Sequence, residues 1–318
     1  MKKFIFNIIM FLIPIIAYAL IIFSLYDQVI RKPYIQRNRS EHLIEILQKN
    51  ETLTYNTFIL GNSRSQMLKA YNFNKCSEDN SLAFHFDNPG GNIYHFYNSL
   101  NYLISKYSVK RVILFIDGQS INFKVDDNNY ATNLSPEINS KYLDYYFSFI
   151  KGFFDYKMIA SILYKEFEMS PLDFFRGYVL DEKSYNSTDL ITGDIEFEVD
   201  RLIKRDRINF YESGEFDYLF ENKYQADKLK MNTSKQYLHK IKSIFDIHNI
   251  NYSIVIPPVY LNESTSKEQV ELIKKIFNPT SVLDFSASPN IYNDKYFFKD
   301  YSHFNEQFGE IIFSKIEF

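Results

Sequence analysis

Five short apolar runs, separated by helical stretches, constrain the fold of this 318-residue chain more than any other feature. Runs of this kind are typical of strands that are buried on both faces of a parallel sheet. Their alternation with amphipathic segments predicts an α/β fold, in which a parallel five-stranded sheet carries helices on both faces in three layers. The predicted strands are residues 57–60, 81–86, 111–116, 251–256 and 281–285.

A serine follows the first of these strands. The apolar run stops at Gly61, and Ser63 lies on the turn into a helical segment that begins near Ser65. Open parallel sheets bind their ligands at the carboxyl ends of strands. A hydroxyl there can project into a cleft, where N–H groups of a helix N-terminus can stabilise a developing oxyanion. Ser63 is therefore a candidate nucleophile, and the simpler alternative is that it only caps the helix.

An Asp-x-x-His motif near the other end of the chain complements this serine. Asp300 and His303 are three residues apart and precede the last helical run. On one tight turn both side chains can face the same way. The carboxylate can then orient the imidazole, while the second ring nitrogen takes a proton from a serine. Together the two motifs predict a catalytic triad of Ser63, His303 and Asp300.

With these two motifs the chain resembles the SGNH/GDSL hydrolase superfamily. It is most similar to the membrane-anchored proteins of cell-envelope acylation, such as DltD-like and alginate O-acetylation proteins. The family's Gly-Asp-Ser block corresponds to Gly61-Asn62-Ser63, and its Asp-x-x-His block to Asp300 and His303. The resemblance spans residues 53–318 and implies a flavodoxin-like SGNH fold with its catalytic domain outside the cytoplasm.

The resemblance also implies an oxyanion hole. Its donors would be the backbone N–H of Ser63 and a glycine of the second block, for which Gly91 is the match. Asn92 could donate its amide or only cap the helix predicted at 93–106. The family's third block, Gly-x-Asn-Asp, is absent after the third strand, where Asp117 either lines the site or only forms the turn. Arg64 follows the nucleophile and either binds an anionic group or is a structural partner.

The N-terminus carries a second strong signal. Lys2 and Lys3 precede an apolar run that extends from residue 4 to residue 25. About 20 apolar residues suffice to cross a bilayer as a helix. We therefore predict a transmembrane anchor at residues 1–26 and a stem at 27–52, with a helix at 41–48. Ala17-Tyr18-Ala19 leaves a cleaved signal as the alternative, and basic residues on both sides of the run leave the orientation to the family resemblance.

Residues 123–233 lack the alternation of strands and helices. Their many Tyr, Phe, Asp and Asn residues predict a mostly helical insertion that covers the active-site end of the sheet. Aromatic faces suit sugar rings or lipid headgroups, but they also form ordinary core. Arg201, Lys204 and Arg205 lie in a charged stretch that is either a solvated surface or a site for an anionic ligand.

Composition narrows the function classes. The net charge of −3 gives no reason to expect a nucleic-acid partner. The single cysteine, Cys76, cannot form an internal disulfide and is expected to be buried and inert. No histidine spacing indicates a zinc site and no Gly-rich loop indicates a dinucleotide, so we expect neither a metal nor a cofactor. The histidines outside the motif, which are expected to be structural, are His42, His85, His95, His239 and His248.

These features predict an extracytoplasmic, membrane-anchored serine acyltransferase or esterase that acts on a cell-envelope polysaccharide or glycolipid. The acyl acceptor, water or a sugar, is left open. An alternative is a non-catalytic binding or assembly partner of a membrane-bound O-acyltransferase, which the irregular third block favours. A third is a signal-anchored structural protein with accidental motifs. A structure with Ser63 and His303 on opposite sides of the sheet would favour this third alternative.

Overall fold

The computed structural model describes residues 2–25, 39–76, 81–122, 134–139, 187–213, 216, 232–261, 264–286 and 289–316. Five parallel strands form one sheet in the order β2-β1-β3-β6-β7. Counted along the chain this is the order 2-1-3-4-5 of flavodoxin-like, doubly wound sheets. The predicted α/β fold with a five-stranded parallel sheet is therefore confirmed. The strands are β1 (Tyr55–Gly61), β2 (Leu82–Asp87), β3 (Arg111–Phe115), β6 (Asn251–Ile256) and β7 (Val282–Asp284).

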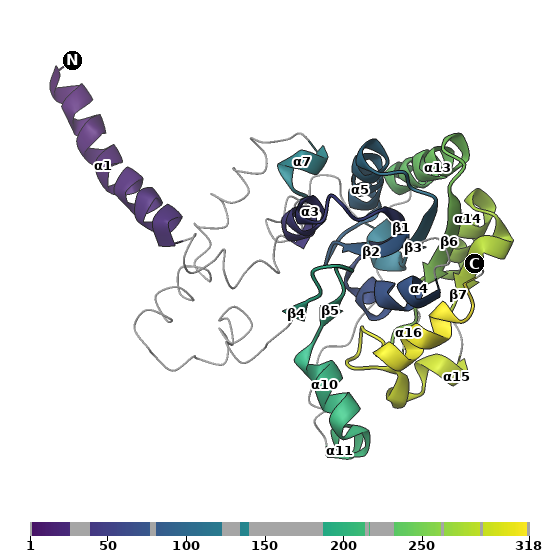
Figure 1. The fold of residues 1–318 in the computed structure, drawn as a ribbon. Coiled ribbons are helices and arrows are strands. Elements are labelled where there is room, and N and C mark those ends of the chain that lie inside the picture. Colours follow the sequence, from purple (N-terminus) through teal and green to yellow (C-terminus); the bar gives the residue numbers. More distant parts are fainter. Residues whose placement is uncertain are drawn as a thin grey trace.

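Helices cover both faces of the sheet (Figure 1). The first face packs against α3 (Arg39–Lys49), α5 (Ile93–Lys106), α13 (Asn232–Ile247) and α14 (Lys267–Ile276). The second face packs against η2 (Ser63–Met67), α4 (Ala70–Cys76), α11 (Arg207–Glu212) and α16 (Glu306–Phe313). Each element thus buries its apolar stripe against the sheet, which gives the three layers.

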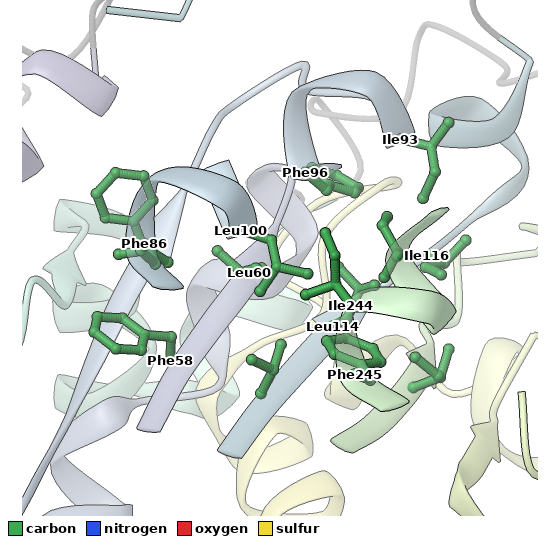
Figure 2. Close-up of a cluster of buried hydrophobic side chains, with 14 of the residues drawn as sticks. Phe58, Leu60, Phe86, Ile93, Phe96, Leu100, Leu114, Ile116, Ile244 and Phe245 are labelled. Carbon is green, nitrogen blue, oxygen red and sulfur yellow. The ribbon is translucent and has the colours of Figure 1, made fainter. Parts of the chain in front are cut away.

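Alternation along the strands divides the core between these faces. Phe58 and Leu60 of β1 point to the first face, while Ile59 between them points to the second. Successive side chains of a strand point to opposite sides, so a strand that is buried on both faces is largely apolar. Figure 2 shows the first-face cluster, in which α5 contributes Phe96 and Leu100 and α13 contributes Phe245.

The predicted N-terminal helix is present as α1 (Lys2–Leu25), which is drawn apart from the sheet in Figure 1. Most of its described side chains are apolar and exposed, for example Phe4 at 68% and Phe11 at 69%. When only the described residues are counted, no helix combines the length and the apolar character that a bilayer span needs. The predicted transmembrane helix is therefore not confirmed.

Several predictions for other segments need correction. The turn that carries the candidate nucleophile Ser63, called the nucleophile turn below, does not lead into one helix from Ser65. It continues as the 3-10 helix η2, and α4 begins only at Ala70. Cys76 is exposed, because it lies in the last turn of α4. In the described part of the predicted helical insertion, β4 (Ser187–Thr188) and β5 (Ile195–Glu196) form an antiparallel pair. Its described helices are α7 (Pro136–Asn139), α10 (Glu198–Arg205) and α11. The aromatic segments at 142–147, 153–156 and 174–176 lie outside the described residues.

A glycine lets α16 approach the nucleophile turn closely. A Cβ atom on Gly309 would lie 2.0 Å from the backbone carbonyl oxygen of Met67, the last residue of η2. Alanine is normally about 1 kcal/mol better than glycine inside a helix. Here the clash with backbone outweighs this gain, because neither element can move without repacking the second face.

We expect Gly309→Ala to lower the free energy of unfolding by about 1–3 kcal/mol. Chemical denaturation of the full chain measures this change. Gln307→Ala is the matched control, because Gln307 is an exposed position on the same helix. A Gly309→Ala protein as stable as the control would show that the two elements do not meet as closely as described.

Candidate active site

The turn that carries Ser63 is fixed by hydrogen bonds around it. Asn62 caps η2, and its Oδ1 accepts from the backbone N–H of Arg64 at 3.0 Å. The Asn62 carbonyl accepts from the backbone N–H of Ser65 at 3.0 Å. Glycine is required just before, because a Cβ on Gly61 would lie 2.7 Å from Cβ of Ser65. Ser63 itself is the first residue of η2 and is half-buried, so Asn62 and not Ser63 is the N-cap.

The loop with the Asp-x-x-His motif is closed by two buried phenylalanines. Phe298 and Phe304 form an isolated antiparallel bridge, and both are fully buried in the second-face core. The bridge leaves only five residues for the turn between them, and the backbone N–H of Lys299 donates to the carbonyl of His303 at 3.0 Å. The apolar anchors thus force Asp300 and His303 onto one tight turn, as their spacing predicts.

The structure brings the three predicted triad residues together. His303 Nε2 lies 2.8 Å from Oγ of Ser63. His303 Nδ1 lies 2.9 Å from each carboxylate oxygen of Asp300. The hydroxyl follows β1 and the imidazole precedes α16, yet both lie at the carboxyl end of the sheet, where ligands bind in open α/β folds. The two motifs therefore do not lie on opposite sides of the sheet, which is the placement that would have favoured accidental motifs.

Asp300 is held as a carboxylate. Burial alone would raise its pKa, but the charge of His303 and hydrogen bonds from His303 and the backbone N–H of Ser302 lower it to about 2. Its Oδ1 accepts from the backbone N–H groups of Ser302 at 2.8 Å and of His303 at 2.9 Å. A carboxylate that is ionised at neutral pH can fix the Nδ1–H tautomer and stabilise an imidazolium.

The oxyanion donors match the prediction only in part. No described residue accepts a hydrogen bond from the backbone N–H of Ser63, so this donor can serve an oxyanion. The N–H of Gly91 instead donates to the carbonyl of Asn88 at 2.7 Å, because the Gly-Gly sequence closes a tight turn after β2. Asn92 caps α5 by accepting from the backbone N–H groups of Tyr94 and His95. The predicted role of Gly91 as a donor is therefore not supported.

Arg64 and Asp117 form a buried ion pair. Their side chains are 3% and 1% exposed. Burial alone would raise the pKa of Asp117, but the adjacent Arg64 guanidinium and a hydrogen bond from Asn62 hold it below its usual value. Arg64 Nε also donates to the carbonyl of Ser302 at 3.0 Å. The pair therefore joins the ends of β1 and β3 to the histidine loop, which favours the structural alternative for both residues over a substrate contact.

The other predicted basic residues lie elsewhere. Arg201 pairs with Glu198 at 3.1 Å and Glu196 at 3.3 Å on a partly exposed surface. Lys204 pairs with Glu306 at 2.8 Å, and Arg205 is exposed. These pairs fit the simpler interpretation of a solvated charged face.

Sequence reasoning missed a buried lysine beside the triad. Lys299 is 4% exposed, and its Nζ lies 3.5 Å from the ring centroid of Phe197. Burial lowers the pKa of Lys299. Nearby Asp200 and Asp300 oppose this shift only in part, and the resulting pKa is about 8. A lysine next to Asp300 gives no sequence signal, because no local pattern shows that Phe197 of the insertion covers it.

This lysine predicts a pH-dependent stability. The unfolded chain keeps its Lys299 proton up to about pH 10.5, but the folded chain releases it near pH 8. Raising the pH between these values therefore stabilises the folded state. Relative to Lys299→Met, we expect the wild-type free energy of unfolding to rise by up to about 3 kcal/mol between pH 8 and 10.5. Denaturation across this range measures it, and Lys235→Met, at an exposed lysine, is the control. Parallel curves for wild type and Lys299→Met would contradict the assignment.

No model of a known protein family matches the chain, and no curated protein matches it significantly. The fold and the geometry of the site are therefore the observations from which a function can be inferred.

Proposed function

We propose that the protein is a serine acyltransferase or esterase of the SGNH type. The single observation that carries this proposal is the continuous contact from Ser63 Oγ through His303 to the ionised Asp300, at 2.8 and 2.9 Å. A serine hydroxyl is a weak nucleophile until an adjacent base accepts its proton, and this arrangement supplies such a base with its orienting group.

The geometry supports a two-step reaction. Ser63 Oγ bonds to the acyl carbonyl carbon while its proton passes to Nε2 of His303, and the Ser63 N–H stabilises the tetrahedral oxyanion. The bond to the leaving alcohol then breaks, and the alcohol takes the proton from His303. An acceptor hydroxyl next gives its proton to His303 and attacks the acyl-serine. Ser63 recovers the proton as the acyl group leaves.

The cell-envelope setting is part of the same proposal. It is supported by the apolar N-terminal run at residues 4–25 and by the exposed apolar side chains of α1. A membrane-anchored domain outside the cytoplasm would act on an acylated polysaccharide or glycolipid. Water as acceptor makes the protein an esterase, and a sugar hydroxyl makes it an O-acyltransferase.

One observation favours a second candidate function. Because the N–H of Gly91 is used within its own turn, the oxyanion site has one assigned donor, Ser63. A protein that keeps the fold but lacks strong acyl transfer could instead bind an envelope glycan as an assembly partner of a membrane-bound O-acyltransferase.

Reaction with a fluorophosphonate separates the two functions. An activated serine attacks phosphorus, expels fluoride and leaves its proton on the histidine, whereas an idle serine does not react. We expect the full chain to be labelled at Ser63, as mapped by mass spectrometry of its peptides. Labelling should require His303, so His303→Gln is the matched control. Absence of label on the folded wild-type chain would favour the binding partner.

A further inference from the structure

A second series of contacting serine, histidine and aspartate side chains lies next to the nucleophile turn, on the buried side. Ser65 Oγ is 2.8 Å from the carbonyl oxygen of Asn62 and 3.1 Å from Nε2 of His85. On the other side of the ring, His85 Nδ1 is 3.3 Å from Oδ1 of Asp194. Ser65 and His85 are fully buried, so this serine is not exposed to a substrate. The arrangement therefore needs an explanation other than a second nucleophile.

The donors and acceptors fix where the protons are. The carbonyl of Asn62 can only accept, so the single hydroxyl proton of Ser65 points to it. Nε2 of His85 must then donate to the Ser65 oxygen. Nδ1 must also donate, because the Asp194 carboxylate faces it. The only arrangement that satisfies every contact is an imidazolium with a proton on both nitrogens.

The surroundings of Asp194 agree with this assignment. Its two oxygens accept from the backbone N–H groups of Ala70 at 2.8 Å and Tyr71 at 3.0 Å, at the start of α4. Burial alone would raise the pKa of Asp194, but His85 and these two N–H groups hold it below its usual value. An ionised aspartate beside a doubly protonated histidine forms a buried pair with no net charge.

This series of hydrogen bonds ends at the peptide group whose N–H is the proposed oxyanion donor. The Asn62 carbonyl and the Ser63 N–H belong to one peptide unit. The carbonyl accepts twice, from the N–H and from the hydroxyl of Ser65. Linked hydrogen bonds polarise one another in a low-dielectric interior, so a stronger bond at the carbonyl makes the N–H a stronger donor.

We propose that Ser65, His85 and Asp194 are positioning residues that hold and polarise the Asn62–Ser63 peptide for oxyanion stabilisation. This inference rests on the proposed acyl-transfer function. It assigns a role to His85, the sole histidine of the sheet strands, and to Asp194 of the insertion. It also explains how a site with a single assigned N–H donor can stabilise an oxyanion, because hydrogen bonds to the carbonyl of the same peptide make that N–H a stronger donor.

The protonation state of His85 is the first test, and it does not depend on activity. The full chain has six histidines, so selective ¹⁵N-histidine labelling gives few ring signals. The His85 signals are those that disappear in His85→Gln. We expect both ring nitrogens to show bound protons at pH 7, in exchange that is slow because the ring is fully buried. A neutral His85 ring overturns the proposal, whatever the protein catalyses.

The second test measures the reaction of Ser63 with the fluorophosphonate. Loss of a whole oxyanion donor lowers the rate by about 10²–10³-fold. Weakening one donor in Ser65→Ala should therefore slow the transfer of the phosphonyl group to Ser63 by about 10–100-fold. We expect Asp194→Asn, which keeps the shape of the carboxylate, to slow it in the same direction. The maximal rate should fall, while the half-saturating reagent concentration and the pH midpoint set by His303 stay unchanged. A merely structural defect would move all three.

Ser243→Ala is the matched control, because it removes a serine hydroxyl from the exposed surface of α13. If the wild-type chain is labelled and both variants react within twofold of it, the positioning role is wrong and the acyl-transfer proposal stands. If the folded wild type is not labelled, the acyl-transfer proposal fails, and this role falls with it.

Discussion

Turnover of p-nitrophenyl acetate by the full chain is expected to fall by at least about 10³-fold when Ser63 is replaced by alanine. The variant keeps the fold and His303, but no atom is left to bond to the acyl carbon. Activity that remains would come from water and the remaining polar groups of the site. Initial rates at saturating ester, after a check of thermal unfolding, measure the loss.

Ser302 provides a demanding comparison. Its hydroxyl also contacts the imidazole of His303, but at Nδ1 and at 2.9 Å, on the side that faces Asp300. Ser302→Ala should therefore lower turnover by less than about tenfold, because the backbone N–H groups that hold Asp300 remain. Equal losses in the two serine variants would show that the identity of the nucleophile is wrong.

The second large effect concerns stability. We expect Arg64→Met to lower the free energy of unfolding by about 3–5 kcal/mol, because it leaves the carboxylate of Asp117 buried without its partner. Urea denaturation of the full chain at pH 7 measures the difference. Turnover should fall as well, since Arg64 Nε holds the carbonyl of Ser302 in the histidine loop.

A double variant separates the lost ion pair from lost packing. Asp117→Asn removes the unpaired charge, so Arg64→Met combined with Asp117→Asn should recover part of the stability lost in the single variant. The two side chains are in contact, so their effects are not expected to add. A stable Arg64→Met protein with weakened binding of an anionic substrate would instead restore the role that the sequence suggested for Arg64.

The parts of the fold that depend on local patterns could be predicted from the sequence. A strand that is buried on both faces is largely apolar. This pattern predicts the ends of all five strands of the sheet to within two residues of their observed ends. The motifs at Ser63 and at Asp300 and His303 could also be recognised in the sequence. Each lies next to an element boundary, and parallel strands bring such boundaries to one end of the sheet.

The parts that depend on distant partners could not be predicted. Asp117 is 53 residues from Arg64, and Asp194 is 109 residues from His85. Nothing in the local sequence of either aspartate tells a turn former from an ion-pair partner. Gly91 shows the same limit at the level of one bond, because its motif suggests a donor but the tight turn after Asn88 already uses the N–H.

The separation of the two reacting groups along the chain has a consequence for biogenesis. Ser63 and His303 are 240 positions apart, and the histidine lies in the loop that precedes α16. A ribosome therefore makes the hydroxyl of Ser63 240 residues before the imidazole of His303. Until the histidine loop has been made and has docked beside Ser63, the hydroxyl lacks its base, so the proposed acyl chemistry cannot begin.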